Sequence, residues 1–109
     1  MSTLGEAKLL RNRTKAFAVR IIKAFARLPK DEAVRVIGRQ ILRSGASLAA
    51  DFISKISVVV EETDETLFWF ELWVEAELTK ENLVEPLMKE CQELLKIFSA
   101  SLATAKRNR

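Results

Sequence analysis

Three arginines recur at intervals of four in this 109-residue sequence: Arg35, Arg39 and Arg43. Residues four apart share one face of an α-helix, so this spacing predicts a ridge of positive charge. The ridge either binds phosphate groups or is a solvated face neutralised by carboxylates elsewhere in the protein. Basic residues earlier in the chain could extend it: Arg20, Lys23 and Arg27. Together these six residues are the candidate nucleic-acid-binding surface.

The charge is unevenly distributed along the chain. Residues 1–49 contain eleven Lys and Arg against three Asp and Glu, whereas residues 50–109 contain seven against twelve, and the balances of +8 and −5 sum to the net charge of +3. This asymmetry leaves two interpretations open. The protein has a basic surface for a polyanion, or its two halves attract each other in the folded state.

The acidic residues at helical spacing raise the question of a di-iron site: Glu61, Glu62, Glu65, Glu71 and Glu75. Di-iron helical bundles use Glu-x-x-His motifs, and this sequence contains no histidine. The same absence argues against Ser-His-Asp and Cys-His catalysis, and there is no glycine-rich phosphate loop. We therefore expect a protein that is not an enzyme, has no metal or cofactor, and shows no small-molecule substrate site.

The single cysteine, Cys91, lies among leucines and Phe98 at helical spacing, which predicts a packed and unreactive thiol. No segment is long and apolar enough to span a membrane, and the N-terminus lacks the features of a signal peptide. One cysteine fits a reducing compartment. We expect a soluble, cytoplasmic protein without disulfides.

The elements that position these residues are predicted to be helices, because the sequence has only three glycines and two prolines. Apolar residues recur at three- and four-residue intervals over about residues 13–28, 31–49, 51–76 and 80–105. Pro29 would end the first helix, and Asp31 would cap the second. A single all-α domain over residues 1–109 follows, built as an antiparallel, up-and-down four-helix bundle.

The predicted last helix has a heptad-like seam of alternating three- and four-residue steps. Its members are Val84, Leu87, Cys91, Leu94, Phe98, Ser101 and Ala105. In the second helix, Gly38 and Gly45 are seven apart and fall on one face. Because glycine in a helix costs about 1 kcal/mol relative to alanine, this pair predicts a helix-packing groove where another backbone approaches closely.

The segment LFWFELW, residues 67–73, is apolar at four consecutive positions, which one buried stripe does not accommodate. Phe68 and Trp69 point in different directions, and Trp73 lies one turn after Trp69. More than one face of this helix must therefore be covered. We predict that Phe68, Trp69 and Trp73 form a contact between subunits.

Three segments, GRQILRSGASLAA, ADFISKIS and EETDETLFWFELW, resemble the four-helix-bundle protein family encoded in intervening sequences of bacterial 23S ribosomal RNA genes. The resemblance extends from about Phe17 to Arg107. The family includes accessory proteins of diversity-generating retroelements. The resemblance implies homopentameric rings of short up-and-down bundles, and basic oligomers that bind nucleic acid. The family's Arg-Ser-Gly motif falls on Arg43, Ser44 and Gly45, and its aromatic-acidic segment on Asp64 to Trp73.

One departure from similar sequences lies between Ala49 and Asp51, where about 15 residues, or roughly four helical turns, are absent. Neither residue signals a chain reversal, so the predicted second and third helices would join without a turn. We predict a loop missing from the sequence at this point. A true deletion, or one long helix that exchanges partners between chains, are the alternatives.

Two functions remain open. The first is an oligomer that binds RNA or DNA through its backbone or shape, because the sequence shows no interleaving of aromatic and basic residues for reading bases. The second is a structural or protein-interaction oligomer without nucleic-acid binding. In that case the arginines pair with carboxylates such as Glu61, Glu65 or Glu71.

Overall fold

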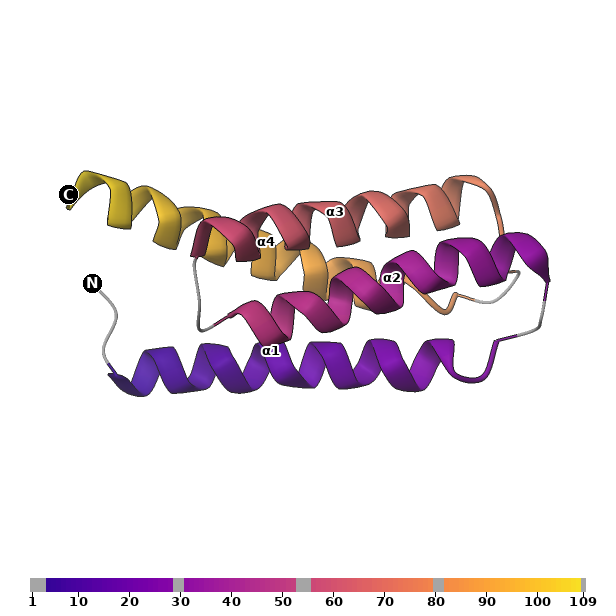
Figure 1. Ribbon diagram of the computed structural model, residues 1–109, viewed down its shortest axis with the longest axis horizontal. Coiled ribbons are helices and arrows are strands. Elements are labelled where there is room, and N and C mark those ends of the chain that lie inside the picture. The colour runs from indigo at the N-terminus through magenta and orange to yellow at the C-terminus, as the bar shows by residue number, and fades with distance from the viewer. Residues whose placement is uncertain (1–3, 29–30, 53–55, 80–81, 109) are drawn as a thin grey trace.

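The computed structural model describes residues 4–28, 31–52, 56–79 and 82–108. It contains four α-helices, α1 (Leu4–Phe25), α2 (Glu32–Asp51), α3 (Ile56–Glu75) and α4 (Glu85–Arg107), with no strand in these ranges. The helices form a four-helix bundle measuring 47 × 21 × 20 Å, and the beginning of α1 and the end of α4 lie toward the same end (Figure 1). The predicted all-α class is confirmed.

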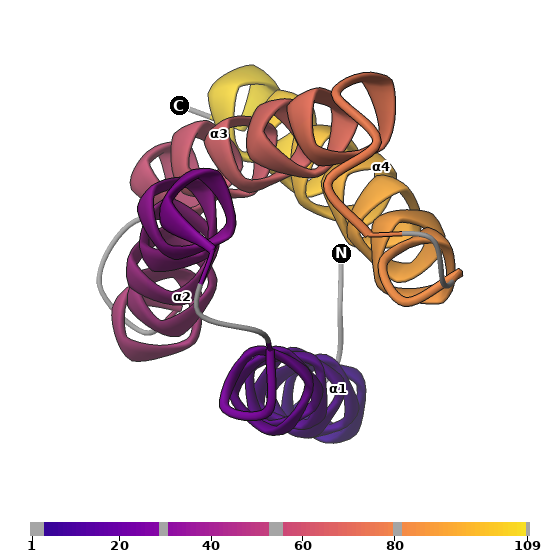
Figure 2. The same ribbon diagram turned by 90° about the vertical axis from the view of Figure 1, so that its right-hand side faces the viewer.

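In the view along the bundle, α1 and α3 lie at opposite corners, with α2 and α4 between them (Figure 2). α2 packs against both α1 and α3, while α4 packs against α3 and, over a shorter stretch, against α1. Within the described ranges, α1 and α3 make no backbone-level contact. The outer faces of these two helices therefore belong to opposite sides of the molecule.

The core is a continuous set of apolar side chains from all four helices, and its centre is aromatic. The rings of Phe25 and Trp73 meet edge to face with centroids 5.1 Å apart, and Phe17 and Phe70 do so at 6.4 Å. Trp73 is 1% exposed, and its Nε1 donates to Thr79 Oγ1 at 3.2 Å. Trp73 is thus a core residue, which corrects its predicted place at a subunit contact.

α1 begins at Leu4, well before the predicted start at residue 13. The buried stripe continues toward the N-terminus through Thr14, whose hydroxyl donates to the carbonyl of Leu10 at 2.8 Å and is thereby satisfied inside the helix. Thr14 lies within the predicted helix, and the part that the prediction missed is the stretch from Leu4 to residue 12. The helix ends at Phe25, and Pro29 lies outside the described residues.

α2 is continuous through Ala49 and Ala50 to Asp51, and α3 begins at Ile56. The predicted junction at Ala49–Asp51 is therefore misplaced, because the connection follows Asp51. Residues 53–55, within that connection, lie outside the described residues. The two helices are separate and pack together, so the alternative of one long helix is wrong. A segment missing relative to similar sequences stays a prediction, without the need for a reversal at Ala49.

The N-terminal cap and two glycines determine where α2 begins and how it packs on α1. Asp31 caps the helix as predicted, accepting from the backbone N–H of Ala33 at 2.9 Å and of Val34 at 3.4 Å. A Cβ added to Gly45 would lie 2.5 Å from Ile21 Cδ1, and one added to Gly38 would lie 3.4 Å from the Phe25 ring. The groove beside these glycines is occupied by side chains of α1 rather than by a backbone.

α4 starts at Glu85, with Pro86 in its first turn, and the predicted start at residue 80 lies outside the described residues. Its seam is buried from Val84 through Phe98. Ser101 and Ala105 continue the spacing but are exposed, because the end of α4 diverges from α1 and leaves an open groove there.

Candidate nucleic-acid interface

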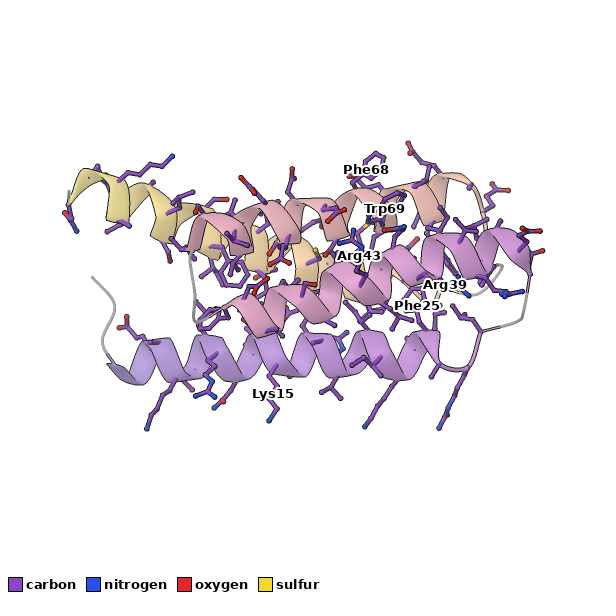
Figure 3. The ribbon with its side chains drawn as sticks, viewed as in Figure 1. Lys15, Phe25, Arg39, Arg43, Phe68 and Trp69 are labelled. Atoms are coloured by element: carbon purple, nitrogen blue, oxygen red, sulfur yellow. The ribbon has the colours of Figure 1, made fainter. Side chains whose placement is uncertain are left out.

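The basic residues of the predicted surface lie on α1, the turn after it, and α2. Arg35 and Arg39 line a groove between the end of α1 and the start of α2, whose floor is apolar and includes Phe25 and Leu42. Figure 3 shows Arg39 on this part of α2. Lys23 and Arg27 are exposed at the same end of α1.

Four of the six predicted residues remain without an acidic partner: Lys23, Arg27, Arg35 and Arg39. Each is exposed, and no described carboxylate lies within ion-pair distance of any of them. A guanidinium or ammonium group in this setting has its hydrogen-bond donors available for an anion. The structure therefore leaves a local excess of positive charge at one end of the α1–α2 pair.

Arg43 differs from its neighbours on the same helix. Its Nη2 lies 2.6 Å from Glu65 Oε1 on α3, and its Nε donates to Gln40 Oε1 at 3.1 Å. Arg20 also differs, because its charge is close enough to Glu90 to help lower the pKa of that carboxyl. Arg43 is thus ion-paired within the protein, whereas Arg20 is exposed and interacts with Glu90 only at longer range.

An ion pair that the sequence did not indicate joins α1 to α4. Arg13 donates to both carboxylate oxygens of Glu90, from Nε at 2.8 Å and from Nη2 at 2.7 Å, with Glu93 3.5 Å away. These hydrogen bonds hold the pKa of Glu90 below its ordinary value. Only the packing of α1 beside α4 reveals this pair, since neither residue shares a helix with the other.

Opposite charges gather on α1 and α3, the two helices at opposite corners of the bundle. α1 contains six Lys and Arg and one Glu, whereas α3 contains six Asp and Glu and no basic residue. The exposed basic residues of α1 include Lys8, Arg11 and Lys15, which preceded or lay beside the predicted helix start and were not assigned to the surface. A longer first helix could have been found from its helix-forming residues alone.

A crowded carboxylate lies where the end of α2 meets α3. Burial raises the pKa of Glu62 to about 7, with further contributions from the neighbouring Asp51 carboxyl and from the charge of Glu65, while Arg43 acts in the opposite direction. Glu62 Oε1 is buried without a hydrogen-bond partner among the described residues. This carboxyl therefore holds a proton at a pH where an exposed glutamate has lost it.

The aromatic segment divides between the interior and the surface. Phe68 is 54% exposed, and its ring meets that of Trp69 edge to face at 5.1 Å. Trp69 is half-buried, and its Nε1 has no acceptor in the described part of the chain. Phe68 points away from the bundle (Figure 3). Of the three residues predicted at a subunit contact, Phe68 is the one that the structure leaves most open.

Three further features of the described residues concern the thiol, metal binding and membrane spans. Cys91 is buried, its thiol donates to the carbonyl of Thr63 at 3.4 Å, and burial raises its pKa to about 12. No group of three or more Cys, Asp or Glu side chains in the described ranges is placed to hold a metal ion. None of the four helices is both long enough and apolar enough to cross a membrane.

A protein of unknown function from the S23 ribosomal protein family of Bacteroides thetaiotaomicron has a solved structure similar to this one. The sequences are 28% identical, the match covers 84% of this chain and 95% of that chain, and the TM-score is 0.70. This match confirms the family resemblance. No protein-family model matches the chain, and no curated protein matches it. The similarity to the S23 family extends to the fold, and the function of the similar protein is unknown.

Proposed function

We propose that this protein is a non-catalytic, cytoplasmic nucleic-acid-binding oligomer that contacts the phosphate backbone of RNA or DNA through its α1–α2 basic surface. We define that surface by Lys23, Arg27, Arg35 and Arg39. One observation carries the proposal: these four side chains are exposed, and no described carboxylate neutralises them. Unpaired Lys and Arg release counterions from phosphates, which drives binding without regard to sequence.

The chemistry of the surface favours contacts with the phosphate backbone of a nucleic acid over contacts with its bases. The aromatic rings near the groove belong to the core, and Phe25 is 7% exposed. Stacking on unpaired bases requires an accessible ring face, which this surface lacks. Contacts with phosphate alone are weak individually and do not discriminate between sequences.

Assembly would make such contacts effective. We propose an up-and-down protomer that forms a homopentameric ring, as the family resemblance implies, with Phe68 and Trp69 at the subunit contact. A ring repeats the four basic residues at fixed spacing, so that several protomers engage one nucleic acid at once. The modest affinity of one surface then becomes useful.

A second candidate is a structural or protein-interaction oligomer. The pair between Arg43 and Glu65, at 2.6 Å, favours it, because this is the internal neutralisation that such a protein would use. The pair between Arg13 and Glu90 is a further instance. This candidate requires the four residues of the α1–α2 basic surface to be neutralised by a partner protein.

The two candidates are separated by fluorescence anisotropy with a labelled structured RNA and a labelled DNA duplex, over a series of salt concentrations. We expect both probes to bind, with log Kd rising linearly with log salt concentration. In the variant Arg35→Gln/Arg39→Gln, two phosphate contacts are lost, so the slope falls by about 2 and binding weakens roughly tenfold or more at low salt.

The matched control is Arg43→Gln, which removes an arginine of the same helix that is already paired with Glu65. We expect its binding to change much less than that of the double variant. If the wild-type protein binds neither probe at low salt, the nucleic-acid proposal is wrong. If Arg43→Gln weakens binding as much as Arg35→Gln or Arg39→Gln does singly, net charge and not this surface determines affinity.

A further inference from the structure

The outer face of α3 has a regular stripe of acidic residues around one aromatic ring. Its members are all exposed and follow steps of four and three: Ser57, Glu61, Asp64, Phe68, Glu71 and Glu75. This is the spacing of a helix that packs along its length against another helix. Within the protomer this face has no helix against it, because α3 packs on α2 and α4 through its other faces.

The outer face of α1 has the complementary stripe. Its members follow the same steps and are all exposed: Lys8, Asn12, Lys15, Val19 and Ile22. Val19 is 39% exposed and Ile22 is 48% exposed, so apolar side chains occupy one part of a basic stripe. Lys15 points away from the bundle on the side opposite to Phe68 (Figure 3).

We infer that the α1 stripe of one protomer packs against the α3 stripe of a second copy of this chain. Lysines then face carboxylates, and Val19 and Ile22 cover Phe68. Charge complementarity of this kind favours the correct partner and disfavours contacts between two like stripes. The two stripes are also comparable in length, since the eighteen residue steps from Ser57 to Glu75 and the fourteen from Lys8 to Ile22 span about 27 Å and about 21 Å of helix.

The charges indicate that the partner of each stripe is a second copy of this chain. An isolated acidic stripe could meet any basic protein, but here the matching basic stripe is on the same chain, at the corner of the bundle farthest from it. The protomer cannot satisfy its own stripes, because the described parts of α1 and α3 meet only through buried aromatic side chains on their inner faces, and both stripes are on outer, exposed faces. The contact is heterologous, so each copy uses one stripe for each of two neighbours.

The inference rests on the oligomeric part of the proposed function and names the face that Phe68 meets. It leaves the α1–α2 basic surface available. Lys23, Arg27, Arg35 and Arg39 are not members of either stripe, so assembly and nucleic-acid binding use different residues.

Two charge-reversal variants of the full-length protein test the contact. The α3 variant is Asp64→Lys/Glu71→Lys, and the α1 variant is Lys8→Glu/Lys15→Glu. Each retains one intact stripe. By sedimentation velocity, we expect self-association of each variant to be at least tenfold weaker than that of the wild type. An equimolar mixture should regain association, because the intact α1 stripe of one variant meets the intact α3 stripe of the other, and the two reversed stripes are again of opposite charge.

Matched controls carry the same change of charge on exposed residues of other faces. Glu32→Lys/Glu85→Lys corresponds to the α3 variant, and Lys89→Glu/Lys96→Glu to the α1 variant. We expect both controls to associate as the wild type does. Recovery of association in the mixture also demonstrates that both stripe variants are folded.

The possible failures are distinct. If the wild type is monomeric at every concentration, both the proposed oligomer and this contact are wrong. If the wild type assembles and the stripe variants assemble equally well, or if their mixture remains monomeric, this contact alone is wrong. If the α1 variant assembles normally and instead loses RNA binding, the α1 stripe is part of the nucleic-acid surface and the inference is overturned.

Discussion

On the side of α2 that faces α3, Arg43 is held by Glu65 with an N–O distance of 2.6 Å. On the side that faces α1, two glycines admit side chains of α1, and Arg35 and Arg39 line a groove with no described carboxylate within ion-pair distance. The three arginines share one residue type, one helix and one four-residue spacing. Their surroundings differ because α2 lies between an acidic helix and a basic one.

The difference shows that spacing determines where a charge lies on a helix, whereas the neighbouring helix determines whether it is free. A stepwise rotation of about 40° per four residues is enough to carry the third arginine toward α3 and leave the first two toward α1. Function then follows from the neighbour: Arg43 contributes to the α2–α3 contact, and Arg35 and Arg39 contribute to a surface.

The largest effect on stability is expected from a large side chain on the face of α2 that packs against α1. Gly45→Leu places a side chain where a Cβ alone would lie 2.5 Å from Ile21 Cδ1, and Ile21 is fully buried. Overpacking of a tight core contact typically costs about 1–3 kcal/mol. We expect the free energy of unfolding, measured with urea, to fall by about that amount.

Gly38→Ala is the control on the same face. Its Cβ would lie 3.4 Å from the Phe25 ring, at the edge of an ordinary contact, and alanine improves the helix by up to about 1 kcal/mol. We expect no loss of stability. Equal destabilisation by both substitutions would show that helix geometry, and not the Ile21 contact, determines the cost.

A smaller effect is expected on the α3 side, and it depends on pH. The pKa of Glu62 is about 7 in the folded protein, against an ordinary value of 4.5. Between these values the folded state binds more protons than the unfolded state, so the free energy of unfolding decreases as pH rises through this window. Allowing for partial exposure of Glu62, we expect a loss of about 1 kcal/mol between pH 5 and pH 8.

Glu62→Gln removes this titration and should flatten the profile, because the amide resembles the protonated carboxyl. Glu61→Gln, one residue earlier and exposed, serves as the control and should leave the profile unchanged. Urea unfolding at several pH values measures both. A profile that stays equally steep in Glu62→Gln would assign the pH dependence to another group.

The sequence predicted much of the fold because each helix has an apolar stripe of the right period. It failed where one helix is apolar on several faces. Residues 67–70 offer no periodic signal, so Trp73 was assigned to a subunit contact, although it is buried in the core of the protomer against the ring of Phe25. Thr14 gave no signal for the opposite reason: the residue type is polar, but its hydroxyl is satisfied within its own helix and the side chain is buried.

The candidate surface was predictable only in part for a related reason. Helical spacing placed Arg35, Arg39 and Arg43 on one ridge, but spacing carries no information on which helix lies beside each residue. The pairing of Arg43 with Glu65, twenty-two residues away, depends on the packing of α2 on α3. The freedom of Arg35 and Arg39 depends equally on the basic character of α1.

The smallest effect distinguishes the paired arginine from a free one. Arg43→Gln breaks a partly exposed ion pair, so we expect a loss of about 0.2–1 kcal/mol, whereas Arg39→Gln should change the free energy of unfolding by less. A double-mutant cycle with Glu65→Gln isolates the pair energy.

Arg43 also lowers the pKa of Glu62, so its removal should raise that pKa and extend the loss of stability to higher pH. If Arg39→Gln produces the same extension, both arginines act on Glu62 through the general field of α2, and the distinction between the two sides of the helix is not electrostatic.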